Sequence, residues 1–174
     1  METGLIGGPE KREITIVDYD RDWPKKFETH AKIIADALGG RALRIEHIGS
    51  TSVRDLAAKP IIDILVVVAD SSDESSYLPQ LESSGHVLRV REPDWNEHRM
   101  LRTPEKDVHV HVYSAGCPEI ERNRSFRDRL RESVPDRCRY EQTKRELASN
   151  LSPDMNAYAD AKTEVIESIL AASG

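Results

Sequence analysis

An uninterrupted apolar run from Ile61 to Val68 constrains the fold of this chain more than any other feature. The run is rich in β-branched residues and has the length of one strand. A strand that is apolar on all sides must be covered on both faces, which predicts a sheet with helices on either side. We therefore expect this segment to be the central strand of an α/β domain. Its one acid, Asp63, needs a physical reason to be buried.

Turn residues and hydrophobic periods place the other elements around this strand. A helix is expected from an N-cap at Asp22, with Pro24 in its first turn, to a stop at Gly39 and Gly40. A strand is expected over Val87–Val90. The alternating segments Arg99–Thr103 and Val108–Tyr113 predict an antiparallel hairpin.

After Pro118 the pattern becomes helical, and we expect helices over about 119–132, 136–149 and 154–172. The sequence thus predicts a mixed β-sheet flanked by helices, with a C-terminal helical tail. No repeat or linker divides the chain, so residues 13–174 are expected to form one domain behind a flexible lead-in over residues 1–12.

The bulk composition narrows the partners and the location. A formal net charge of −6 argues against general nucleic-acid binding and against attachment to an anionic membrane. No run approaches the roughly 18 apolar residues of a membrane helix, and the first residues lack the apolar core of a secretory signal. We therefore expect a cytoplasmic protein, in which Cys117 and Cys138 are free thiols.

The segment with the clearest chemistry runs through Gly49, Ser50, Thr51 and Ser52. A strand that ends in Gly-Ser exposes backbone N–H groups beside small side chains, and this arrangement can cradle a phosphate. Asp63 on the neighbouring strand would then hold a divalent metal, magnesium or manganese. The alternative is a tight turn in which Ser50 or Thr51 only caps a helix.

The strings EHIGSTSV and LAAKPIIDILVVV resemble the signature of the GrpB family, which is assigned to the nucleotidyltransferase superfamily. VDYDRDWPKKFE, DVHVHVY, SFRDRLRE and two Tyr-x-x-x-Lys pairs are similar to family features in the same order, so the resemblance covers about Ile14 to Leu170. The resemblance implies a nucleotidyltransferase-like fold. It also implies that Gly49 and Ser50 face a triphosphate and that Asp63 is the first metal-binding acid.

The chain departs from the family pattern at two places. Arg54 and Asp55 stand where relatives usually carry Pro-Gly, which can reshape the turn after the phosphate loop. Active nucleotidyltransferases usually carry acid-x-acid on the strand of Asp63, whereas this chain has Leu65 at the second position. One metal ligand is therefore missing from the expected set.

Histidines are the candidates for the missing ligand. His109 and His111 alternate with valines and therefore project onto one face of their strand. Together with Glu46 or His47 they could complete a metal site, although histidine favours zinc, iron, nickel or manganese over magnesium. The alternative is that they are hydrogen-bonding residues on a partly covered sheet.

Several cations and aromatics complete the candidate set. Lys59 precedes the Asp63 strand and is placed to meet a phosphate, or it is a solvated lysine. Arg127 lies in an arginine-rich segment, Arg122–Arg139, which would accept a phosphorylated ligand or pair with its own acids. The pairs Tyr140/Lys144 and Tyr158/Lys162 would hold a base and a phosphate, or pack with the lysine directed outward.

Three functions follow from these residues. The first is transfer of a nucleotidyl group from a nucleoside triphosphate to an unknown acceptor, with a divalent metal at Asp63. The second is a non-catalytic accessory domain that binds a nucleotide or coenzyme A. The third is a metal-dependent enzyme that uses His47, His109 and His111.

Overall fold

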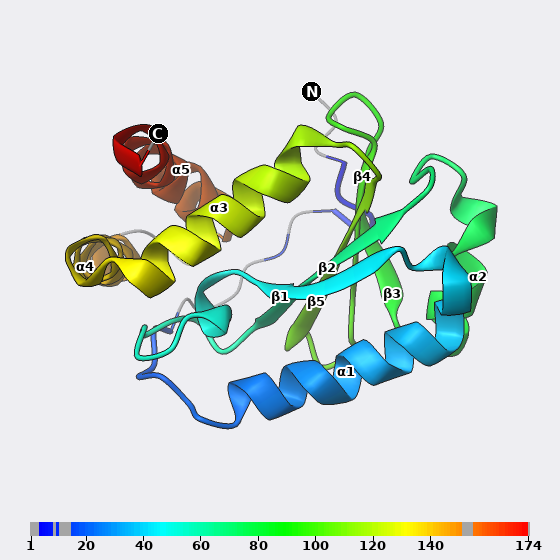
Figure 1. The fold of residues 1–174 in the computed structure, drawn as a ribbon, viewed down its shortest axis with the longest axis horizontal. Coiled ribbons are helices and arrows are strands. Elements are labelled where there is room, and N and C mark those ends of the chain that lie inside the picture. Colours follow the sequence, from blue (N-terminus) through cyan, green and yellow to red (C-terminus); the bar gives the residue numbers. More distant parts are fainter. Residues whose placement is uncertain (1–3, 9, 11–14, 151–154, 174) are drawn as a thin grey trace.

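The computed structural model describes residues 4–8, 10, 15–150 and 155–173, and its centre is one five-stranded mixed sheet (Figure 1). The strands are β1 (Arg44–Ile48), β2 (Ile62–Val68), β3 (Val87–Glu92), β4 (His98–Arg102) and β5 (Val108–Ser114), in the order β1-β2-β5-β4-β3. The helices are α1 (Trp23–Leu38), α2 (Leu78–Ser83), α3 (Pro118–Glu132), α4 (Val134–Asn150) and α5 (Met155–Ser173). The expected class, a mixed sheet flanked by helices, is confirmed.

The pairing of strands confirms the hairpin and corrects the position of the apolar run. β4 and β5 are antiparallel, as the alternating segments predicted. β2 is antiparallel to β1 and parallel to β5, so β5 is the central strand and β2 lies next to it. An apolar run shows that a strand is covered on both faces, but two interior strands meet that condition equally well.

The sheet separates two packing layers. The α1 face holds the largest cluster of buried residues, which includes Ile62, Ile64 and Val66 of β2. The three C-terminal helices lie on the other side of the sheet (Figure 1). There a second cluster joins α3, α4 and α5 to the loop after β1 through Val53, Leu56, Leu130, Tyr140, Val165 and Ile169.

The first helix ends where the sequence predicted, but it lacks the capping hydrogen bond expected from Asp22. α1 ends at Leu38, and Gly39 follows with φ of +55°, a conformation that favours glycine. Asp22 precedes the helix, but its side chain makes no capping hydrogen bond because its own backbone is already helical. The carboxylate of Asp20 accepts the Asp22 backbone N–H instead, at 2.8 Å.

The described residues of the lead-in differ from the expected loose segment. Leu5 forms an antiparallel bridge to Val90, and the Ile6 N–H donates to the carbonyl of Arg89 at 2.8 Å. Glu10 accepts hydrogen bonds from Arg102 and Lys106. The open edge of β3 offers unpaired backbone groups, and residues 4–6 satisfy part of that edge.

The C-terminal helices begin near the prolines that predicted them. Pro118 is the first residue of α3, and Pro135 lies in the first turn of α4. The expected start of the last helix at 154 lies outside the described residues. Cys117 and Cys138 are both free, as expected. Among the described helices, none is long and apolar enough to cross a membrane.

Candidate functional site

A cavity of about 360 Å³ opens between the α3 face of the sheet, the loop after β1 and the C-terminal helices. Ten of the residues selected from the sequence line it: Gly49, Ser50, Thr51, Lys59, Asp63, His109, His111, Tyr140, Lys144 and Lys162. They come from three strands or loops and from two helices that are distant in the sequence. The cavity therefore brings the small-residue corner together with Asp63, which is half-buried.

Asp63, His109 and His111 form the polar centre of the cavity. In the parallel pairing of β2 and β5, Asp63 lies opposite His109 and Leu65 lies opposite His111, so the three polar side chains share one face. Asp63 Oδ1 is 3.0 Å from His111 Nε2 and 3.8 Å from His109 Nδ1. One ligand atom from each residue lies within 4.8 Å of the others.

The donor set fits a divalent transition metal. Ligands of a tetrahedral ion at bonds of about 2.1 Å stand roughly 3.5 Å apart, so these three need only small movements to close on an ion. One carboxylate with two imidazoles suits manganese, iron or zinc better than magnesium. The Nδ1 atom of His109 faces Asp63, whereas its Nε2 atom is buried without a hydrogen-bond partner, as is one ring nitrogen each of His30 and His86.

The protonation states are those that a metal requires. Burial opposes the charge on Asp63, but the hydrogen bond from His111 and the nearby charges of His111, His109 and Lys59 lower its pKa to about 2. Burial lowers the pKa of His109 to about 4, against the attraction of Asp63. At neutral pH Asp63 is therefore charged and His109 is neutral, so both offer lone pairs.

Gly49 holds the loop against the carboxylate of Asp63. A Cβ atom at this position would lie 2.6 Å from Asp63 Oδ2, and the residue has φ of +73°. Both facts require glycine. The backbone of the corner therefore passes directly beside the proposed metal ligand.

The hydroxyl groups after Gly49 have unequal roles. Thr51 Oγ1 donates to the carbonyl of Ile61 at 3.1 Å, and Ser52 Oγ donates to the carbonyl of Gly49. Ser52 does not line the cavity, whereas Ser50 does and is half-buried. Thr51 and Ser52 thus hold the shape of a short 3₁₀ turn, Ser50–Ser52, and Ser50 is the hydroxyl that faces the cavity.

Glu46, His47 and Arg127 are not brought to the cavity. His47 points to the opposite face of the sheet, where it stacks on Phe27 at 4.8 Å and its Nε2 lies 3.0 Å from Thr51 Oγ1. Glu46 instead pairs with Arg124 and Arg127. The predictions that Glu46 or His47 binds the metal and that Arg127 binds the nucleotide are therefore wrong for this cavity. Sequence spacing showed neither the ion pairs of Glu46 nor the face of the sheet on which His47 lies.

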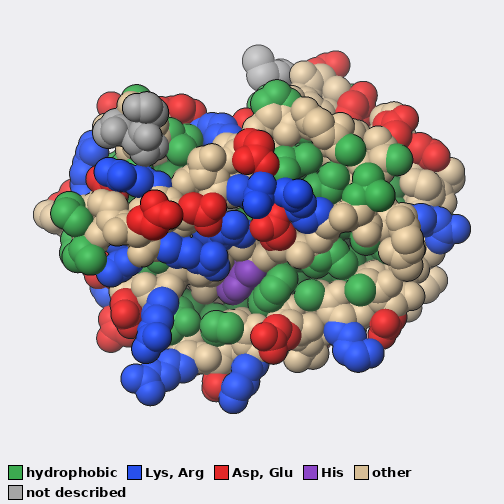
Figure 2. Space-filling model, viewed as in Figure 1, with side chains coloured by type: hydrophobic (Ala, Val, Ile, Leu, Met, Phe, Trp, Pro, Cys, Tyr) green, Lys and Arg blue, Asp and Glu red, His purple; other side chains and the backbone are tan. Residues whose placement is uncertain are grey.

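The arginine-rich segment is largely paired with its own acids. Arg122 contacts Glu119 and Glu167, and Arg124 contacts Glu121 as well as Glu46. Figure 2 shows basic and acidic side chains interspersed over α3. Local pairing therefore explains most of this basic concentration, and Arg122 is the one arginine of the segment that lines the cavity.

The helical wall of the cavity presents Tyr140 and Lys144. Both side chains are buried, and the ammonium of Lys144 lies 4.8 Å from the centre of the Tyr140 ring. Lys144 Nζ donates to the carbonyl of Ala57 at 2.7 Å, so it does not extend outward into solvent. Burial lowers its pKa well below the usual value. The side chain of Tyr158 lies outside the described part of the chain.

Comparison with known proteins shows the family of this chain. The family model described as GrpB protein matches residues 13–172. The chain belongs to the GrpB family. It is 49% identical to a UPF0157 protein of Halalkalibacterium halodurans over 162 residues, which is 93% of this chain and 83% of the relative. It is also 49% identical to a UPF0157 protein of Streptomyces coelicolor, over 98% of this chain and 89% of the relative.

Solved structures agree with this family. The crystal structure of GrpB from Enterococcus faecalis has a TM-score of 0.73 and 32% identity, covering 88% of this chain and 98% of that one. A structure of the RNA terminal uridylyl transferase Cid1 has a TM-score of 0.46 and 15% identity, covering 75% of this chain and 44% of that one.

Two departures from the GrpB pattern now have structural descriptions. Asp55, in place of the usual glycine, has φ of +65°, a region in which aspartate is tolerated better than most residues. Leu65, in place of a second acid, is fully buried with Ile48 and Val67. The turn keeps the conformation that glycine would take, whereas the second acid is replaced by packing.

Several residues that line this GrpB cavity were not selected from the sequence, among them Trp95, His98 and Tyr113, and neither was Glu92, which contacts His98. His98 received little weight as a site residue. A signal was available in the hairpin, since Met100 pairs with His111 and His98 is two residues earlier on the same face. His98 Nε2 lies 3.1 Å from His111 Nδ1.

Proposed function

We propose that this GrpB protein binds a nucleoside triphosphate together with one divalent transition-metal ion in the cavity, and transfers a nucleotidyl group to an acceptor. The observation that carries the proposal is the contact between the glycine corner and the acid. Asp63 Oδ2 lies where a side chain of residue 49 would begin. A phosphate beside Gly49 and Ser50 would therefore stand next to an ion held by Asp63, His109 and His111.

The cavity offers a distinct surface for each part of a nucleotide. Lys59 and Lys162 line it and supply positive charge near the phosphates. Phe126 and Tyr140 supply aromatic surface for a base, with their rings edge to face at 5.1 Å. The metal would offset charge on the reacting phosphate, and the protein would contribute positioning.

The buried position of Leu65 limits the chemistry to one metal ion. A two-metal transfer needs enough carboxylates to fix both cations, and the position of a second acid is occupied by packing. This observation also favours a second candidate, a domain that binds the nucleotide without turning it over. Dephospho-CoA kinase of Mycolicibacterium paratuberculosis, 25% identical over 175 residues, contains a similar segment within 43% of its length. An accessory role beside a kinase is consistent with that arrangement.

The test is calorimetric titration of ATP and UTP into the protein in the presence of Mn²⁺. We expect binding that requires the metal, and a loss of at least about 100-fold in affinity for Asp63→Asn, because an uncharged amide is a poor metal ligand. The matched control is Asp36→Asn. Asp36 is an exposed acid of α1 that pairs with Lys32 at 3.0 Å, on the side of the sheet opposite the cavity (Figure 1).

Failure of the wild-type chain to bind any nucleotide with Mn²⁺ would remove the proposal. Equal binding by wild type and Asp63→Asn would remove the assigned site. Release of pyrophosphate from a bound triphosphate separates the two candidates. Turnover that Asp63→Asn abolishes supports transfer, and tight binding without turnover supports the accessory domain.

A further inference from the structure

The ring of His111 connects the proposed metal site to a second pair of residues, the buried His98 and the half-buried Glu92. Its Nε2 faces Asp63 Oδ1 at 3.0 Å, and its Nδ1 faces Nε2 of His98 at 3.1 Å. The other nitrogen of His98, Nδ1, faces Glu92 Oε2 at 2.7 Å. Asp63, His111, His98 and Glu92 therefore form a continuous chain of three polar contacts, which we call the histidine chain.

The middle of the histidine chain is fixed by packing. His98 is only 7% exposed and stacks on Tyr113, with ring centres 4.9 Å apart and an angle of 23°. Trp95 contacts the edge of the same ring at 5.4 Å. Because aromatic rings cover His98 in this way, it cannot rotate to exchange its two nitrogens without disturbing its neighbours.

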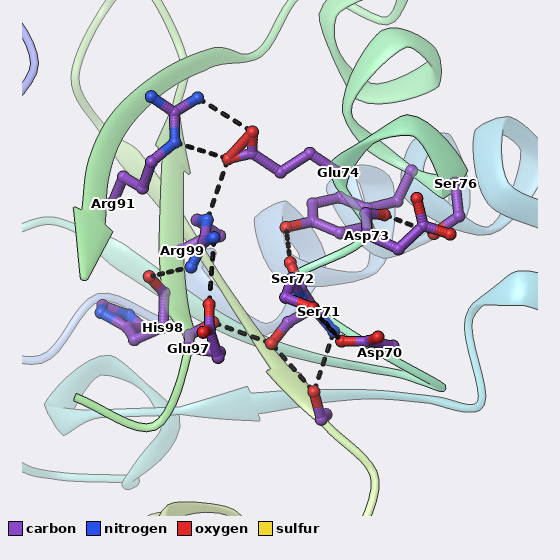
Figure 3. A network of polar contacts seen from close by, with 12 residues as sticks. Asp70, Ser71, Ser72, Asp73, Glu74, Ser76, Arg91, Glu97, His98 and Arg99 are labelled. Carbon is purple, nitrogen blue, oxygen red and sulfur yellow. Dashed lines mark hydrogen bonds and ion pairs between the residues drawn. The ribbon is translucent and has the colours of Figure 1, made fainter. Parts of the chain in front are cut away.

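The turn that precedes His98 is held by a separate polar network. Asn96 and Glu97 both have positive φ, 55° and 49°, which is costly for a residue such as glutamate. Figure 3 shows Arg99 contacting both Glu74 and Glu97, and Ser71 Oγ donates to the carbonyl of Glu97 at 2.7 Å. The surroundings thus fix a strained turn whose result is the position of His98.

The protons of the histidine chain can be counted. An uncharged imidazole carries one N–H and one acceptor lone pair. Two such rings supply two protons for three contacts, so one contact would bring two acceptor atoms together unless one ring carries a second proton. An ion between Asp63 and His111 Nε2 removes the conflict, because that contact no longer needs a proton. His111 then donates from Nδ1 to His98, and His98 donates from Nδ1 to Glu92.

We infer that His98 and Glu92 are positioning residues for the metal site: they hold His111 in the tautomer whose Nε2 lone pair points at the ion beside Asp63. The inference rests on the proposed metal site and adds two residues to it. Metal-bound histidines commonly donate their second N–H to an acceptor that fixes the ring and raises its basicity. Here the acceptor is a second histidine, and a carboxylate ends the chain.

The first test measures Zn²⁺ affinity of the full chain by competition with a chromophoric chelator. We expect Glu92→Gln to weaken Zn²⁺ binding about 10- to 100-fold, the range found for such outer partners. His98→Phe should weaken it at least as much, because it keeps an aromatic ring on Tyr113 but removes the acceptor for His111. The matched control is Glu28→Gln, an exposed acid of α1 on the opposite side of the sheet. It should change affinity less than about fivefold.

The second test reads the tautomer directly and needs no variant. In the Zn²⁺-loaded wild-type chain, ¹⁵N spectra of labelled histidines should show His111 with its proton on Nδ1 and the metal on Nε2. A proton on Nε2, or zinc on Nδ1, would overturn the inference. Urea unfolding of each variant shows whether lost affinity reflects a lost fold, and the wild-type spectra decide the question if a variant does not fold.

The outcomes separate this inference from the proposed function. If the wild-type chain binds no Zn²⁺, both the proposed metal site and the positioning role of His98 and Glu92 are wrong. If Asp63→Asn abolishes Zn²⁺ binding while Glu92→Gln and His98→Phe bind Zn²⁺ as the wild type does, only the positioning role is wrong. Equal losses in Glu28→Gln and Glu92→Gln would show an effect that does not pass through the histidine chain and would also overturn the role.

Discussion

On the α1 face of the sheet, β2 and β5 present aliphatic side chains up to Ser114 at the end of β5, whereas on the α3 face the same two strands present an acid, two histidines and a tyrosine beside Leu65 and Val67. The first set is Ile62, Ile64, Val66, Val108, Val110 and Val112, all fully buried. The second set includes Asp63, His109, His111 and Tyr113. The strands alternate between the two sets residue by residue.

One pair of strands can therefore place the residues that stabilise the core on one face and the polar residues of the cavity on the other, by alternation alone. The aliphatic face packs against α1 and makes a dry core. The opposite face borders a cavity because α3, α4 and α5 pack on one another and on the loop after β1. Substitutions on neighbouring residues of β2 should therefore have opposite consequences for stability and for metal binding.

The largest expected effect comes from the aliphatic face. Ile64→Ala removes a fully buried side chain from the core and should lower the free energy of unfolding by about 2 to 5 kcal/mol, with Mn²⁺ affinity unchanged. Asp63→Asn, one residue away, should change stability less than Ile64→Ala and abolish metal binding. Urea unfolding and calorimetry on both variants measure this. A loss of metal affinity in a folded Ile64→Ala chain would break the separation of the two faces.

Much of this arrangement follows from the sequence because it depends on local periods. The apolar run, the hairpin, the end of α1 at Gly39 and the helices after Pro118 are all set by neighbours within a few residues. The alternation of His109 and His111 with valines also predicted correctly that both face one side. The family resemblance pointed to Gly49, Ser50 and Asp63, and all three line the cavity.

The remaining features depend on contacts between distant segments. His47 was grouped with the metal ligands, but the β1–β2 register pairs it with Ile64 and so turns it to the aliphatic face. His98 lies alone in the sequence and joins the site only through the pairing of β4 with β5. Lys144 was expected either to hold a phosphate or to point outward, and its burial depends on the carbonyl of Ala57, 87 residues away. Periodicity carries no information on such pairings.

One histidine on each face of the sheet has a lowered pKa. Burial lowers the pKa of His47, on the α1 face, and of His109, on the α3 face, to about 4. The unfolded chain titrates these rings near 6.5, so between pH 6.5 and 4 it binds more protons than the folded chain. The free energy of unfolding should therefore fall as the pH is lowered through this window, by up to about 3 kcal/mol for each ring.

Variants assign this pH dependence to the two faces. Urea unfolding at pH 7.5 and 4.5 should show a smaller difference for His47→Gln than for the wild type, and a similar reduction for His109→Gln. Saturating Zn²⁺ should stabilise the wild type and His47→Gln at pH 7.5 but not His109→Gln. If zinc stabilises His109→Gln as much as the wild type, then His109 is not a ligand.

The smallest effect on stability, and the sharpest on the site, is expected at Gly49. Gly49→Ala and Gly39→Ala both place alanine at a positive φ, 73° and 55°, in backbone conformations that favour glycine, so each should cost at least about 1 to 3 kcal/mol of unfolding free energy. They differ in what the new methyl group meets. At residue 39 there is no atom within 4 Å among the described residues, whereas at residue 49 the methyl lies 2.6 Å from Asp63 Oδ2 and 3.1 Å from its Cβ. The Asp63 carboxylate must rotate away, and its contact with His111 must open.

Calorimetry with Mn²⁺ should therefore show at least a tenfold loss of affinity in Gly49→Ala and none in Gly39→Ala, because only the first substitution displaces a ligand. Equal affinity in the two variants would mean that the carboxylate can move without cost to the ion, and that the contact between corner and acid does not organise the site.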